Sequence, residues 1–95
     1  MSIHLGVATV RLEITDALTL KDKRSVVRSL LDRIRGTFNV SVAEIGSLDA
    51  HNNALIAIVG VSNDGRYVNG QLDLVIKMIE RDPRALLLDY DIELT

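Results

Sequence analysis

Residues 19–36, TLKDKRSVVRSLLDRIRG, and residues 38–45, FNVSVAEI, decide the fold of this chain. In the first segment apolar residues recur at helical spacing, which predicts an amphipathic helix with one buried stripe. Thr19 and Asp22 have the spacing of a reciprocal N-terminal cap, and we expect Gly36 to end the helix in the left-handed conformation. The second segment predicts a strand. The stripe consists of Val27, Leu30, Leu31, Ile34 and Phe38.

Positive charge is concentrated in this predicted helix. Six of the eleven Lys and Arg residues lie between positions 21 and 35, although the chain has a net charge of -2. Such cations attract a nucleic-acid backbone with salt-sensitive, sequence-independent affinity. The competing interpretation is a solvated face on which Asp32 pairs with Arg28 and Arg35. The candidate residues for binding a nucleic acid or another partner are Lys21, Lys23, Arg24, Arg28 and Arg35.

The remaining segments complete a strand-helix-strand-strand-helix-strand order. Residues 3–14, 54–62 and 86–94 have the apolar or alternating patterns of strands, residues 64–81 have helical spacing, and residues 46–53 form a polar loop. This order predicts an α+β, ferredoxin-like fold, in which a four-stranded antiparallel sheet carries two helices on one face. We expect residues 1–95 to form this single domain, with the first and third strands at its centre.

The last strand has an acidic side. Its apolar members, from Leu86 through Leu88 to Leu94, alternate with a second set that includes Asp89, Asp91 and Glu93. Uninterrupted alternation predicts that one side faces the core and the acidic side faces water. The acidic row also discourages pairing at this sheet edge.

The first and third strands are apolar on both sides, although the helices can cover only one face of the sheet. An open apolar face is unusual for a soluble monomer, so we expect a second copy of the chain to cover it and form a homodimer. Loops or the long first strand curling over the face are the alternative. The residues expected at the dimer face are Leu5, Val7, Leu55, Ala57 and Val59.

Composition restricts the class of protein further. The chain has no cysteine, which excludes disulfides and thiolate metal sites and suits a cytoplasmic location. No apolar stretch reaches the length of a membrane span, and no signal peptide is recognisable. His4 and His51 lack the convergent partners that a metal site needs. We therefore expect no metal and no cofactor.

Several segments resemble the YlxP-like family of uncharacterised bacterial proteins. They are residues 20–35, 38–44, 59–64 and 88–93. The resemblance implies a ferredoxin-like fold and, because genes of the family often stand beside translation and ribosome-maturation genes, a role near RNA or the ribosome. It supplies no catalytic residues. Family members carry a tryptophan in the loop between the second and third strands, whereas the loop here, residues 48–53, has none.

Other functions of the same fold find less support in the sequence. RNA-binding domains of this topology stack bases on aromatic residues of the central strands, but the aromatic residues here, Phe38, Tyr67 and Tyr90, lie elsewhere. The glycine-rich phosphate loop of acylphosphatases is absent around Arg11. We expect a non-enzymatic domain that binds RNA or a ribosome-assembly partner through the basic helix face, and no membrane. The alternative is a dimeric regulatory module that binds a small molecule.

Overall fold

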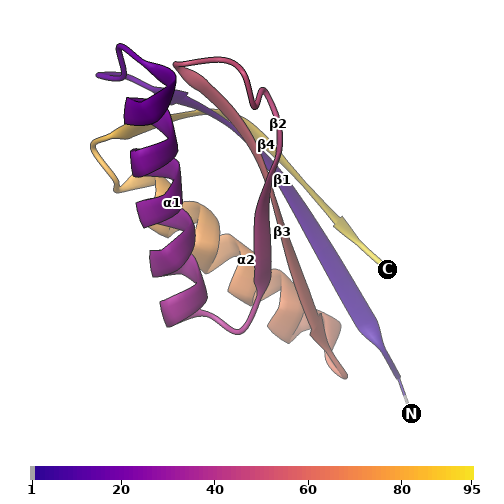
Figure 1. Ribbon diagram of the computed structural model, residues 1–95. Helices are drawn as coiled ribbons and strands as arrows, with labels where there is room; N and C mark the ends of the chain where they lie inside the picture. The colour runs from indigo at the N-terminus through magenta and orange to yellow at the C-terminus, as the bar shows by residue number, and fades with distance from the viewer. Residues whose placement is uncertain (1) are drawn as a thin grey trace.

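The computed structural model describes residues 2–95 and has the predicted element order (Figure 1). The sheet order is β2-β3-β1-β4, and each pair of neighbouring strands is antiparallel. The ferredoxin-like prediction is therefore confirmed, including the central position of the first and third strands. The elements are β1 (His4–Ile14), α1 (Leu20–Thr37), β2 (Ser41–Gly46), β3 (Asn53–Ser62), α2 (Gly65–Glu80) and β4 (Ala85–Leu94).

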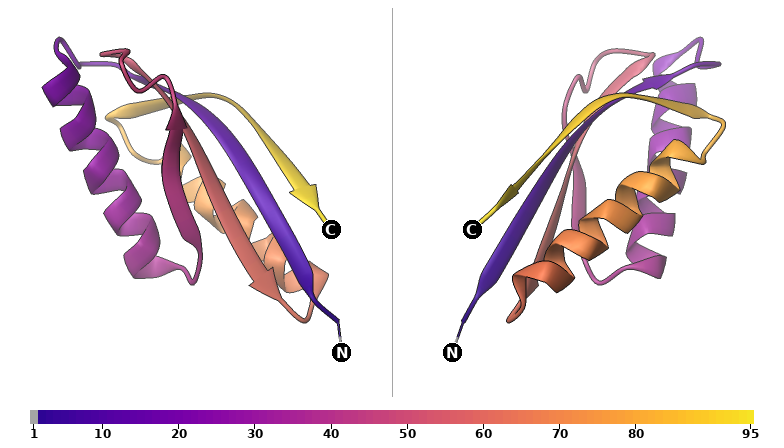
Figure 2. Two further views of the ribbon diagram at one scale, coloured as in Figure 1. Left: turned by 45° about the vertical axis from the view of Figure 1, so that its right-hand side comes forward. Right: turned by 180° about the vertical axis from the view of Figure 1, so that it is seen from behind.

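Both helices lie on the same face of the sheet, and the opposite face is left open (Figure 2). The core fills the space between the two layers. It is built from alternate residues of β1 and β3, such as Val10 and Ile58, and from the apolar stripes of the helices, such as Leu30 and Leu72, all with 0% exposure. The periodicities of two for strands and 3.6 for helices thus place one side of every element in the same interior.

The start of α1 has the predicted reciprocal cap. The Thr19 hydroxyl accepts a hydrogen bond from the Asp22 amide at 3.1 Å, and the Asp22 carboxylate accepts one from the Thr19 amide at 3.2 Å. These bonds satisfy amides that have no partner within the first turn of a helix.

The predicted role of Gly36 is wrong. No glycine among residues 2–95 has a positive φ, and α1 continues through Thr37, whose hydroxyl donates to the Arg33 carbonyl. The helix ends because Phe38 is extended while its amide still donates to the Ile34 carbonyl. Phe38 then packs against the core, so β2 begins three residues later than predicted, at Ser41.

An irregularity in β4 overturns the prediction of uninterrupted alternation. Arg11 of β1 lies opposite Asp89 and Leu12 lies opposite Leu87, which leaves Leu88 without a partner in a β-bulge. Because directly opposed residues share a face, Leu87 is on the helix side, whereas Leu86 is on the open side. Beyond the bulge the alternation holds, and the three carboxylates of β4 lie on the open face of the sheet as predicted, opposite Arg11, Thr9 and Val7.

Close packing of α2 on the sheet depends on Gly6. A Cβ atom at this position would lie 2.6 Å from Val68 Cγ1 and 2.7 Å from Leu72 Cδ1. Both of these α2 side chains are buried, so they have little room to move away. The missing side chain at Gly6 therefore sets how closely α2 approaches β1.

We predict that Gly6→Ala destabilises the protein by about 1 to 3 kcal/mol, because the added methyl group overpacks the core. Gly70→Ala is the matched control, since nothing lies within 4 Å of a Cβ at that helical position. This control should be neutral or stabilising by up to about 1 kcal/mol. Urea unfolding of both variants measures the difference, and equal stabilities would contradict the role given to Gly6.

Candidate nucleic-acid interface

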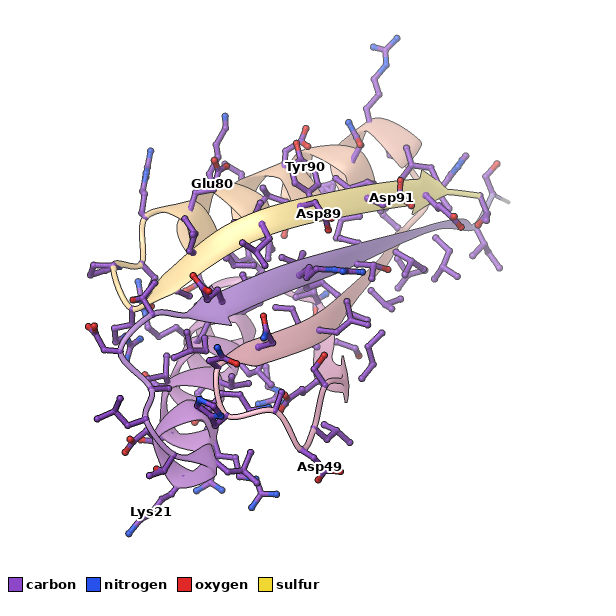
Figure 3. All side chains as sticks on the ribbon, turned by 90° about the horizontal axis from the view of Figure 1, so that it is seen from above. Lys21, Asp49, Glu80, Asp89, Tyr90 and Asp91 are labelled. Atoms are coloured by element: carbon purple, nitrogen blue, oxygen red, sulfur yellow. The ribbon has the colours of Figure 1, made fainter. Side chains whose placement is uncertain are left out.

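Three basic side chains form a row on the outside of α1. Lys21, Arg24 and Arg28 are exposed and, at a rise of 1.5 Å per residue, the row is about 10 Å long. Within the described residues 2–95, none of the three forms a salt bridge. Figure 3 shows Lys21 extending from α1 away from the body of the protein. These three residues are called the cation row below.

A hollow of about 750 Å³ runs along the same side of α1. Besides the cation row, it is lined by Ser25, Ser29, Asp32 and Arg33. Hydroxyl, ammonium and guanidinium groups all donate hydrogen bonds, so the hollow offers donors to an anionic oxygen. Asp32, the one carboxylate that lines the hollow, forms its salt bridge with Arg35, at 3.1 Å, and not with the cation row.

The prediction that Lys23 belongs to the exposed basic surface is wrong. Its side chain has 0% exposure, and its Nζ donates to Glu44 Oε2 at 2.8 Å, to the Ser47 carbonyl at 2.9 Å and to the Asn53 carbonyl at 3.1 Å. An ammonium has three donors, so these three oxygens satisfy it completely. Lys23 lies four residues before Val27 and therefore on the buried stripe of the helix. This spacing is the feature of the sequence from which its burial could have been predicted.

The buried ammonium also organises the loop between β2 and β3. Ser47 has a φ of 60°, in the left-handed region that non-glycine residues seldom occupy. Its carbonyl accepts both the Lys23 ammonium and the Ala50 amide. These bonds hold the backbone in this strained conformation. The contributions of Glu44, Ser47 and Asn53 to this site were missed by the sequence reasoning.

Arg35 is mostly committed to the fold. One guanidinium nitrogen donates to Asp32, as predicted, and the other donates to the Val42 carbonyl of β2 at 3.1 Å. The bond to Val42 covers a carbonyl on an edge strand that would otherwise be open to pairing. The expected pair between Arg28 and Asp32 is not formed within residues 2–95. Arg28 is therefore available and Arg35 much less so.

A second buried charge fixes the other end of α1. Asp82 is 4% exposed and accepts hydrogen bonds from Arg84 at 2.8 and 3.0 Å and from Arg33 at 3.1 Å. Arg84 also donates to the Ser29 hydroxyl. The hydrogen bonds from Arg84 lower the pKa of Asp82, and the reciprocal bond raises the pKa of Arg84. Arg33 is thus a structural residue that joins α1 to the turn before β4.

The five residues predicted for a dimer face do lie together on the open face of the sheet. Val7 is directly opposite Val59, and Leu55 and Ala57 follow on the same side of β3, next to Arg11 and Thr9. Leu5 and Val61 extend this group. The association of two copies of the chain through this face stays a prediction.

Two classes of feature are absent from the described part of the chain. Residues 2–95 contain no group of three or more His, Cys, Asp or Glu side chains that could hold a metal ion. Nor does this range contain a helix with the length and apolar character required to cross a membrane.

Comparison with protein families gives a match to "Protein of unknown function (DUF503)" over residues 5–92. The chain belongs to the DUF503 family. It is similar to "Uncharacterized protein YlxP" of Bacillus subtilis (strain 168), with 34% identity over 79 residues, which cover 83% of this chain and 86% of that protein. The resemblance read from the sequence is thereby confirmed.

Solved structures similar to this DUF503 chain show the fold alone. The de novo designed protein Foldit4 aligns with a TM-score of 0.53 and 12% identity over 96% of both chains. The de novo designed protein LFR1 1, which has a ferredoxin fold, aligns with a TM-score of 0.50 and 14% identity over 98% of this chain and 86% of that chain.

The buried ammonium of this DUF503 chain makes a prediction about stability. We expect Lys23→Met to destabilise the protein by about 3 kcal/mol or more, because Glu44 and two carbonyl oxygens lose their partner in a buried site. Lys21→Met, which removes an exposed lysine two residues earlier, should change stability by less than about 0.5 kcal/mol. Urea unfolding distinguishes the two residues. A small effect at Lys23 would show that its site contributes little.

The ionisation of Asp82 predicts how the stability of the fold depends on pH. The native pKa of Asp82 lies below its value in the unfolded chain, so its ionised form stabilises the fold above about pH 4. This contribution is lost as the pH falls through the native pKa. We expect Asp82→Asn to cost about 2 kcal/mol at neutral pH and much less in strong acid. The measurement is the midpoint of urea unfolding for Asp82→Asn and for the unmodified protein, at neutral pH and in strong acid. An equal decrease of the midpoint under both conditions would contradict the role given to the ionised Asp82.

Proposed function

We propose that this protein is a non-catalytic RNA-binding domain that contacts the phosphate backbone through the cation row of α1. The observation that carries the proposal is that Lys21, Arg24 and Arg28 are exposed and lack acidic partners within residues 2–95, although the whole chain has a net charge of -2. Basic residues that only keep a helix soluble gain from i, i+4 pairing with acids. This row has no such pairing.

The chemistry of the row suits phosphate oxygens. Each arginine presents a planar set of donors that matches phosphate in a bidentate manner, and Lys21 adds a point charge. Ser25 and Ser29 place hydroxyl donors in the same hollow. Displacement of counterions by three cations gives an affinity that falls as salt rises.

The surroundings of the row favour contacts to the backbone over contacts to bases. Helix α1 contains no aromatic residue, so the surface offers no platform on which an unpaired base could stack. Phosphate contacts position a protein without specifying sequence. The gene neighbourhood implied by the family resemblance supports ribosomal RNA as the source of the phosphates.

The test is sedimentation with purified bacterial ribosomal subunits at low salt. We expect the triple variant Lys21→Gln, Arg24→Gln and Arg28→Gln to lose co-sedimentation. For naked ribosomal RNA, it should reduce the slope of log affinity against log salt by about 2 to 3, since three cations each release counterions.

A matched control separates the row from net charge. The triple variant Arg66→Gln, Lys77→Gln and Arg81→Gln removes the same charge from exposed positions in and next to α2. It should bind as the unmodified protein does. Equal loss of binding in both variants would show that the interaction depends on overall charge and not on the cation row. If the unmodified protein does not bind, the proposal is wrong.

A further inference from the structure

The open face of the sheet has an apolar centre and an acidic border. Val7 and Val59 form the middle of one row across the sheet, with Ser41 on one side and Glu93 on the other. The next row reads Ala43, Ala57, Thr9 and Asp91. The acids of this face are the three carboxylates of β4, at one edge, and Glu13 near the end of β1. Figure 3 shows Asp89 and Asp91 along β4.

We propose that a second copy of the chain covers this face in a two-fold symmetric dimer. Protein interfaces combine an apolar centre with a polar, hydrated rim, and the open face has this arrangement. Its centre on β1 and β3 includes Leu5 at 38% exposure and Val61 at 61% exposure. The carboxylates of β4 can stay hydrated at the rim.

The acidic strand selects the orientation of the symmetry axis. An axis across the strands would place β4 over β4 of the partner and bring the carboxylates of both copies together, which is unfavourable because like charges repel. An axis parallel to the strands, between β1 and β3, places β4 over the partner's β2 instead. In that arrangement the Val7 side of one copy packs on the Val59 side of the other, so the apolar centre is complementary to itself.

The area of the face fits a dimer of modest stability. With strands about 4.8 Å apart and a rise of about 3.3 Å per residue, three strands of 10 or 11 residues and one of 6 cover roughly 600 Å² per copy. Both copies together bury roughly 1,200 Å², the lower end of the range for specific interfaces. We therefore expect a reversible dimer and not a permanent one.

The dimer is independent of the proposed RNA contact. The cation row belongs to the helical layer, on the side of the sheet away from the open face (Figure 2). A basic, apolar segment of another protein would also suit an apolar face with an acidic border. We favour the second copy because Asp89 already lies 3.8 Å from Arg11 of its own chain, and in the parallel arrangement the other carboxylates of β4 can stay hydrated.

Sedimentation velocity over a range of protein concentrations tests the proposal. We expect a monomer–dimer equilibrium that Val59→Lys weakens at least about tenfold, because it places a charge in the apolar centre. Val61→Lys should also weaken the dimer. Because Val61 is already 61% exposed, a lysine at this position does not disturb the folded core. The matched control is Leu74→Lys on α2, at 49% exposure, which should leave the equilibrium unchanged.

Cross-linking tests the orientation, and the lack of native cysteine makes introduced thiols unique. A mixture of Val7→Cys and Val59→Cys chains should be linked by a short bismaleimide, whereas Asp91→Cys chains should not. Linking of Asp91→Cys chains alone would overturn the parallel axis. A monomer at every concentration would overturn the dimer and leave the face to a different protein, without affecting the RNA proposal.

Discussion

The hydrogen bonds of the Lys23 ammonium join the start of α1 to β2, to the following loop and to β3 through a single nitrogen. The amine comes from the first turn of α1, and its acceptors come from β2, the following loop and β3. A buried charge is tolerated only when its environment provides the hydrogen bonds that water would provide. The position of α1 over the β2–β3 hairpin is therefore restricted to the one that brings three oxygens to this nitrogen.

The far end of α1 is held by the same kind of interaction, in which Arg33 and Arg84 share the buried Asp82. Apart from these two anchors, the helix carries basic side chains that the fold does not use. Roughly half of the positive charge of α1 is thus structural, and the other half is presented on a rigid support. A rigid helix loses little conformational entropy when it binds a partner. This is the physical reason why three side chains can be assigned a binding role.

Most of the architecture could be predicted because it depends on local patterns. Three such features are each determined by residues that are close together in the sequence. They are the apolar stripe from Val27 to Ile34, the reciprocal cap at Thr19 and the central strands that are apolar on both sides. The failures concern interactions between distant segments. The acceptors of Lys23 are 21, 24 and 30 residues away, and the end of α1 depends on Phe38 turning into the core. The exposed part of the candidate site was predicted, and its buried part was not.

The unpaired Leu88 has a consequence for changes in the length of this chain. On either side of the bulge, β4 keeps its own register with β1, with Leu87 opposite Leu12 and Asp89 opposite Arg11. Loss of this one residue would leave a regular ladder in which both pairs, and the sides they occupy, are retained. The connection from α2 can therefore vary by one residue in length while the carboxylates remain on the same face. The bulge therefore allows the turn to change in length without changing which side chains the far part of β4 presents on the sheet.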